Sequence, residues 1–253
     1  MNTDSHRSPE LSADPVDAGP QRRRAQPLVA WRALRRLLAD PERTEEVFIV
    51  IRALAGDAIQ RGLERFQRLP AGQRILTEKR ELLDTLMDRD ALAQHPAGSL
   101  AAAYLDFTGR EQITADGLVD ASDSEQEVYD NDWQRLYGER LRDQHDLWHT
   151  LTAYGRDVLG EMCLLWFTYA QTRNRGIGSI AAVALVKLIK EQGWSVAGAA
   201  WRAYRDGRRA EWLPGQDWEA LLALPIETVR SNLRLVRPER YLAVRDSFEP
   251  LPA

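Results

Sequence analysis

A chain of 253 residues can form one large domain or two small ones, and its 44% hydrophobic and 28% charged residues are ordinary for a globular protein. Its formal net charge of −4 gives no reason to expect a nucleic-acid partner. The single cysteine, Cys163, excludes an intramolecular disulfide and is consistent with a reducing compartment. No apolar run approaches the roughly 18 residues that span a bilayer, and the first residues lack a signal-peptide core, so we expect a cytoplasmic protein.

Hydrophobic periodicity divides the chain into three parts. Residues 1–26 are polar and contain three prolines, which predicts a disordered tail. Residues 27–245 carry apolar stripes of helical spacing and no run of period two, which predicts an all-α fold in a single helical domain. Residues 246–253 form a C-terminal tail. Helices are expected at residues 28–38, 44–69 (interrupted at Gly56), 75–92 (one or two short helices), 100–107 (capped by Ser99), 124–145, 160–171, 177–191, 194–204 and 221–235 (with a helix start at 225–227). Turns or loops are expected at 70–72, 109–123, 172–176 and 193.

The most informative stretch is the motif His145-Asp146-Leu147-Trp148-His149. Residues four apart lie on the same face of a helix, so His145 and His149 project together, and Asp146 falls within the same arc. Two imidazoles and a carboxylate suit a borderline divalent metal such as zinc, cobalt or iron. An isolated HxxxH pair is often accidental, but the residues that follow favour a metal site.

Glu161 lies eleven intervening residues beyond His149, too far along a straight helix to join the same site. Gly155 is suited to ending one helix and Asp157 to capping the next. The sequence therefore predicts a helical hairpin in which Glu161, about one turn into the second helix, faces back toward the histidines. Trp148 and the leucines beside it are expected to surround the ligands with apolar bulk.

These residues resemble the coenzyme Q (ubiquinone) biosynthesis protein 4 family, whose hallmark is HDxxH followed by eleven residues and a glutamate. Four other segments, residues 72–79, 98–107, 207–218 and 225–230, also resemble family segments, so that the likeness covers about residues 43 to 240. The stretch 173–177 departs from the glycine-leucine-proline turn that the family often has. That departure leaves the shape of the pocket wall open. The hallmark is matched here by His145, Asp146, His149 and Glu161.

The resemblance implies an all-helical protein that acts on a polyprenylated aromatic precursor of ubiquinone. The implied reaction removes the ring C1 carboxylate of a polyprenylated hydroxybenzoate and replaces it with a hydroxyl. It would depend on a divalent metal ion, zinc in the first place and otherwise cobalt or iron. Expected partners are the substrate, other quinone biosynthesis enzymes and a second copy of the chain in a homodimer. The expected catalytic residues and metal ligands are His145, His149 and Glu161, with Asp146 as a fourth ligand or as the group that orients a bound water.

Two other functions stay open at this stage. The motif HDLWH differs from the HExxH motif of zinc peptidases by one methylene in its acid, so a peptidase is one alternative. The other is a non-catalytic, lipid-binding scaffold for a quinone biosynthesis complex, in which the metal is structural. The ligands alone do not separate these functions, because structural and catalytic sites differ in an open coordination position.

The substrate implies two further features of the molecule. An apolar groove should open onto the metal, lined partly by Trp148 and the stretch Ile177–Leu188, although core packing would explain that stretch equally well. Because a polyprenyl tail partitions into the bilayer, we also expect peripheral contact with the inner face of a membrane. The residues expected to make that contact, unless the tryptophans turn inward, are Trp201 and Trp212 with Arg202, Arg205, Arg208 and Arg209.

Overall fold

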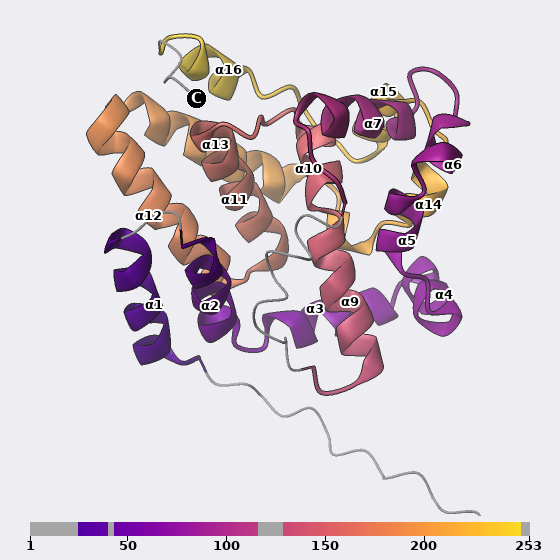
Figure 1. Ribbon diagram of the computed structural model, residues 1–253, viewed down its shortest axis with the longest axis horizontal. Helices are drawn as coiled ribbons and strands as arrows, with labels where there is room; N and C mark the ends of the chain where they lie inside the picture. Colours follow the sequence, from indigo (N-terminus) through magenta and orange to yellow (C-terminus); the bar gives the residue numbers. More distant parts are fainter. Residues whose placement is uncertain (1–24, 40–42, 116–128, 249–253) are drawn as a thin grey trace, which may run out of the picture.

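Helices make up almost all of the chain that the computed structural model describes, which is residues 25–39, 43–115 and 129–248. Figure 1 shows α9 and α10 running through the molecule, with α11, α12 and α13 on one side and α4 to α7 on the other. Within these ranges the only extended pairing is an isolated bridge between Ser99 and Pro225. The predicted all-α fold is therefore confirmed. Among the same residues, no helix combines the length and apolar character needed to cross a membrane.

The N-terminal region contains a predicted break and an unpredicted helix start. Gly56, with φ at +56°, separates α2 from α3, as expected of a residue without a Cβ. Pro70, by contrast, opens a helix, so the turn predicted at residues 70–72 is wrong. Proline suits the first helical position because its missing N–H needs no partner there. The helices of this region are α1 (Pro27–Ala39), α2 (Thr44–Ala55), α3 (Ala58–Gln67) and α4 (Pro70–Glu78).

The next helices lead toward the predicted metal motif. Ser99 caps α7 as predicted, since its hydroxyl accepts a hydrogen bond of 3.1 Å from the backbone N–H of Ala102. The helix expected from about residue 124 begins at Asp132, since residues 129–131 are not helical; the expected positions 124–128 lie outside the described ranges. Asn131 caps that helix. These elements are α5 (Leu82–Met87), α6 (Arg89–Ala93), α7 (Leu100–Arg110) and α9 (Asp132–Asp143).

The main core forms where α11 (Val158–Thr172), α12 (Arg175–Gln192) and α13 (Ser195–Arg209) pack against one another. The buried rings of Trp148, Phe167 and Trp218 lie in this core. Helices α11 and α13 approach so closely that a Cβ on Gly207 would lie 2.7 Å from the carbonyl oxygen of Phe167. This tight contact lies at Phe167, six residues beyond Glu161 on α11.

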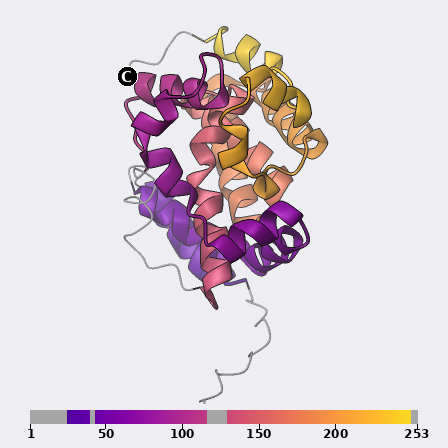
Figure 2. The same ribbon diagram turned by 90° about the vertical axis from the view of Figure 1, so that its right-hand side faces the viewer.

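The C-terminal part contains a predicted helix start. The helical stretch expected over residues 221–235 was given a start at Pro225-Ile226-Glu227, and Pro225 does precede the helix that begins at Ile226. Figure 2 shows this segment in gold beside the purple region of α4 to α7, where the N–H of Leu100 donates to the carbonyl of Leu224. The elements are a 3-10 turn (Leu213–Gly215), α14 (Trp218–Leu221), α15 (Ile226–Asn232) and the unpredicted α16 (Glu239–Arg245).

Candidate metal centre

The predicted hairpin is formed by α10 (His145–Thr152) and α11, which a five-residue turn joins. Asp157 caps α11 by accepting a 3.0 Å hydrogen bond from the N–H of Gly160, and Glu161 lies in the first turn of that helix. Both features are as predicted. The end of α10 is not: it falls at Ala153, whose φ of +57° stops the helix two residues before Gly155.

The turn lies directly against α11. A Cβ on Gly160 would lie 2.1 Å from the carbonyl oxygen of Gly155, so only glycine at position 160 allows this approach. The N–H of Gly155 donates to the Tyr241 hydroxyl at 3.1 Å, and that hydroxyl donates to the carboxylate of Asp157. The turn is therefore held by α11 on one side and by α16 on the other.

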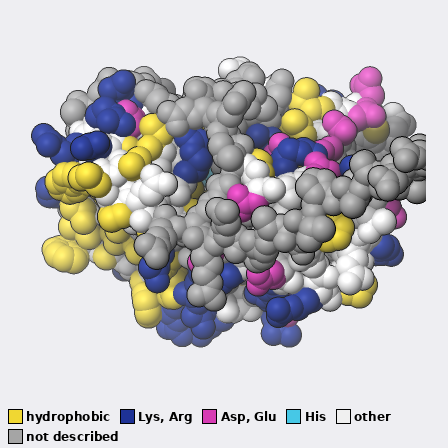
Figure 3. All heavy atoms as spheres, turned by 90° about the horizontal axis from the view of Figure 1, so that it is seen from below, with side chains coloured by type: hydrophobic (Ala, Val, Ile, Leu, Met, Phe, Trp, Pro, Cys, Tyr) yellow, Lys and Arg dark blue, Asp and Glu magenta, His cyan; other side chains and the backbone are white. Residues whose placement is uncertain are grey.

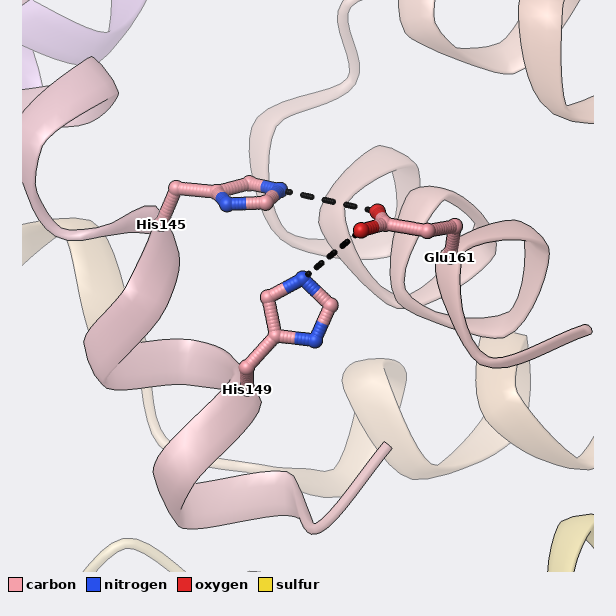
Figure 4. A group of neighbouring side chains, drawn as sticks. All are labelled: His145, His149 and Glu161. Atoms are coloured by element: carbon pink, nitrogen blue, oxygen red, sulfur yellow. Dashed lines mark ion pairs between the residues drawn. The ribbon is translucent and has the colours of Figure 1, made fainter. Parts of the chain in front are cut away.

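Figure 4 shows the side chains of His145, His149 and Glu161 converging from the two helices. Oε1 of Glu161 lies 3.4 Å from Nε2 of His149, and Oε2 lies 4.0 Å from Nε2 of His145. One ligand atom from each residue lies within 4.8 Å of the other two. The structure thus brings together three of the four predicted site residues.

The state of His149 fits a metal ligand. Its Nδ1 donates to the carbonyl of Tyr154 at 2.9 Å, so in the neutral imidazole the lone pair that can bind a metal is on Nε2. That Nε2 atom is buried and has no hydrogen-bond partner among the described residues. A buried polar atom of this kind is unusual in a folded protein unless a missing ligand satisfies it. Nitrogen and oxygen donors in this arrangement suit zinc, cobalt or iron.

The electrostatics of the group also favour a cation. Burial by itself lowers the pKa of His149, but the adjacent Glu161 carboxylate outweighs burial and leaves that pKa raised. Burial likewise raises the pKa of Glu161, but its interactions with His149, His145 and Arg156 outweigh burial and leave this pKa lowered. The raised pKa of His149 means that this ring faces negative charge, and the lowered pKa of Glu161 keeps that carboxylate ionised. A bound divalent cation would take the place of the His149 proton beside an ionised Glu161.

Asp146 lies beside the group without joining it. Its Oδ1 is 3.2 Å from Nδ1 of His145, so the buried carboxylate contacts the ring nitrogen that faces away from Glu161. A carboxylate in this position orients the imidazole and raises the basicity of its other nitrogen. The idea that Asp146 is itself a fourth ligand stays a prediction.

Two aromatic residues lie near the histidines. Phe107, which sequence reasoning did not assign to the site, stacks on the His149 ring with centroids 5.6 Å apart. Its place at the end of the family-like segment 98–107 was the available signal. Trp148 belongs mainly to the core: its N–H donates to Gln144, and its ring meets Phe167 edge-on.

A cavity of about 1050 Å³ opens onto the group, with His145, Asp146 and Glu161 in its wall. The predicted lining by Trp148 and the start of the stretch 177–188 is confirmed, since Ile177 and Ile180 line the cavity. Sequence reasoning missed the walls from α2, α3 and α9, and the arginines among them. Further lining residues from these helices are Ile51, Ile59, Arg61, Arg65, Tyr137 and Leu141.

Comparison with known proteins places the chain in a family. The profile of the coenzyme Q (ubiquinone) biosynthesis protein Coq4 matches residues 21–239. The mitochondrial ubiquinone biosynthesis protein COQ4 of Meyerozyma guilliermondii is 25% identical over 216 residues, which cover 84% of this chain and 67% of the relative. The mitochondrial COQ4 homolog of Xenopus laevis is 28% identical over 135 residues, or 53% of this chain and 46% of the relative.

The chain thus spans about half the length of the first such relatives, namely 46% for Xenopus laevis and 48% for Danio rerio. A crystal structure from Nostoc punctiforme, described provisionally as a ubiquinone biosynthesis protein, has a TM-score of 0.64 and 20% identity. It covers 83% of this chain and 98% of its own, and at that identity it shows a common fold. Because the family profile covers most of the sequence and the histidine-glutamate group stands where the hallmark motif requires, this chain belongs to the coenzyme Q (ubiquinone) biosynthesis protein Coq4 family.

Proposed function

We propose that this protein is a metal-dependent enzyme of ubiquinone biosynthesis that acts on a polyprenylated hydroxybenzoate. The proposed reaction removes the ring C1 carboxylate and places a hydroxyl on C1. The observation that carries the proposal is the cavity of about 1050 Å³ that opens onto His145 and Glu161 in a chain of this family. A cavity of that size is in the upper range of small-molecule sites and suits an aromatic ring with an attached chain.

The proposed reaction is an oxidation, and it requires an oxidant. The bond between C1 and the carboxylate carbon breaks, carbon dioxide leaves, and a bond between C1 and oxygen forms. The ring thereby loses two electrons, and we assign dioxygen as their acceptor. In balanced form, two aryl carboxylates, one dioxygen and two protons give two phenols and two carbon dioxides.

The chain's own residues position the reactants. A divalent cation, when bound, supplies positive charge that stabilises negative charge developing on substrate oxygen. His149 is fixed for its part by the Tyr154 carbonyl and by the stacked ring of Phe107. Asp146 fixes the His145 ring. The apolar side chains of α2, α3 and α12 line the cavity and would hold the prenyl chain and exclude water from the reacting ring.

The test is turnover by the purified protein, reconstituted separately with zinc, cobalt and ferrous iron. The substrate is a hydroxybenzoate that carries a short prenyl chain and a ¹³C label in its carboxyl group. We expect labelled carbon dioxide and the corresponding phenol in air, neither under nitrogen, and neither with His149→Ala. Tight substrate binding without turnover for every metal would instead establish the non-catalytic lipid-binding scaffold. Hydrolysis of a peptide substrate that a chelator abolishes would favour the peptidase.

Peripheral membrane contact is the second part of the proposal, and its residues are revised. Trp201 on α13 is 61% exposed, and Arg202, Arg205, Arg208 and Arg209 are exposed on the same helix. Trp212 turns inward, because it lines the cavity and donates its N–H to the Gln171 carbonyl, so its predicted membrane contact is wrong. Trp194, which is 79% exposed, takes its place.

Tryptophan beside arginine suits the interface of an anionic bilayer. Figure 3 shows further hydrophobic side chains gathered at the end of the molecule where α1 and α12 lie. The protein should sediment with anionic vesicles, and the double variant Trp194→Ala with Trp201→Ala should bind them more weakly. The control is Trp133→Ala, which removes an exposed tryptophan on α9 and should leave vesicle binding unchanged. Equal sedimentation of all forms would contradict this surface. The homodimer and the biosynthetic enzyme partners stay predictions.

A further inference from the structure

The turn between α10 and α11 presents one charged side chain to the cavity. Its other residues are already engaged: the Tyr154 carbonyl accepts from His149, the Gly155 N–H donates to Tyr241, and Asp157 caps α11. Arg156 stands between these fixed residues, and its side chain lines the cavity at 39% exposure. The backbone of the turn is therefore held in place, while the guanidinium at its tip remains open to the cavity.

The contacts of Arg156 leave most of its donors available. Its Nε lies 3.8 Å from Oε1 of Glu161, which is too long for a hydrogen bond. Among the described residues, Glu161 is the only acidic partner of Arg156 in an ion pair. Other arginines of the cavity wall are more firmly held: Arg135 pairs with three carboxylates, and Arg173 donates to the Tyr204 hydroxyl at 3.0 Å.

We propose that Arg156 binds the carboxylate of the aromatic substrate beside the metal centre and selects aromatic acids over the corresponding phenols. This inference rests on the proposed function, because it assumes that the substrate enters the cavity with its acid group toward the metal. A guanidinium presents two parallel N–H groups that match the two oxygens of a carboxylate. A cation held by Glu161 neutralises that residue's charge, which frees Arg156 to pair with a second anion.

The position of Arg156 gives this pairing a chemical consequence. Arg156 and His149 both contact Glu161, at 3.8 Å and 3.4 Å, so the arginine and the metal group are adjacent. A carboxylate held by Arg156 would place ring C1 next to the metal, with the prenyl chain directed into the apolar part of the cavity. A phenol without the acid group would lose this anchor while keeping its contacts with the apolar wall.

The test compares Arg156→Gln and Arg156→Lys with the wild type and with Arg173→Gln, which removes another arginine of the same cavity. Each protein is loaded with zinc and titrated calorimetrically with a short-chain prenylated hydroxybenzoate and with the matched prenylphenol that lacks the carboxylate. We expect Arg156→Gln to weaken binding of the acid by about 10-fold to 100-fold, the range of a charge-assisted hydrogen-bonded pair. Arg156→Lys should lie between, Arg173→Gln should resemble the wild type, and phenol binding should be unchanged throughout.

A second readout separates substrate binding from a merely structural role. If Arg156 only positions Glu161, Arg156→Gln will weaken binding of the acid and of the phenol equally, and that result overturns the proposal. A wild type that does not prefer the acid, or that binds neither compound, overturns it as well. A wild type that prefers the acid through Arg156 but does not turn it over supports this inference while contradicting the proposed reaction.

Discussion

Gly160→Ala should disrupt the candidate metal centre by displacing the turn that joins α10 to α11. A Cβ at position 160 would lie 2.1 Å from the carbonyl oxygen of Gly155, whereas carbon and oxygen pack at roughly 3.2–3.5 Å. The turn and α11 must therefore separate by about 1 Å. His149 is hydrogen-bonded to this turn through the Tyr154 carbonyl, and Glu161 directly follows the substituted residue. The displacement therefore acts on two ligands at once.

The expected magnitude follows from this geometry. Ligand constellations tolerate displacements of about 0.5 Å, so a shift of about 1 Å should lower zinc affinity at least tenfold, or about 1.4 kcal/mol. Overpacking of this kind should also lower the free energy of unfolding by about 1–3 kcal/mol. Calorimetric zinc titration and thermal unfolding measure the two effects separately.

Two other glycines provide matched controls. Gly207→Ala overpacks α13 against α11, where a Cβ would lie 2.7 Å from the Phe167 carbonyl, so it should lower stability and leave zinc affinity unchanged. Gly109→Ala in α7 meets no atom within 4 Å and should raise stability slightly, by about 0.5–1 kcal/mol. The reasoning is refuted if Gly160→Ala binds zinc as tightly as the wild type, or if Gly207→Ala loses as much affinity.

Two further predictions concern regions away from the metal. Arg80 donates two hydrogen bonds of 3.0 Å to Asp217; burial raises the pKa of Asp217, but this pairing outweighs it and leaves that pKa lowered. A lowered carboxyl pKa stabilises the fold above the ordinary value near 4 and loses this effect as the pH falls through the lowered pKa. With allowance for partial exposure, Asp217→Asn should therefore lower the free energy of unfolding by about 1–2 kcal/mol at pH 7. Denaturant titrations should show a progressively smaller loss below pH ~4, and a loss independent of pH would contradict this reasoning. Cys163 is fully buried, and burial raises the pKa of its thiol. A chromogenic disulfide reagent at pH 8 should therefore leave Cys163 unmodified in the native protein and modify one thiol per chain in denaturant. Rapid modification of the native protein would contradict this packing.

The convergence of His145, His149 and Glu161 was predictable because it depends on short spacings. His145 and His149 are one helical turn apart, which fixes their relative direction wherever the helix lies. Asp157, as a favourable N-cap residue, predicted the start of the second helix, and that start places Glu161 in the first turn of α11. The hairpin therefore followed from local capping rules, even though the exact end of α10 did not. Ala153 in a left-handed conformation has no sequence signal, since glycine is the usual residue there.

The features that were missed depend on contacts between distant parts of the chain. The cavity walls from α2 and α3 could not be read from periodicity, because an apolar face looks the same whether it packs on another helix or lines a cavity. Trp212 illustrates this: beside arginines it resembled a membrane anchor, but it stacks under Arg65 with 4.1 Å between the guanidinium carbon and the ring centroid. The orientation of Asp146 toward His145 likewise depends on rotamers that spacing does not determine.

The metal content of the purified protein tests the central claim most directly. Protein equilibrated with zinc and then dialysed should retain one ion per chain in the wild type and in His95→Ala, which removes a histidine outside the metal group. His149→Ala should retain none, because it removes the ligand whose Nε2 is buried without a hydrogen-bond partner. Equal zinc content in the wild type and His149→Ala would contradict the assignment of this group as a metal centre.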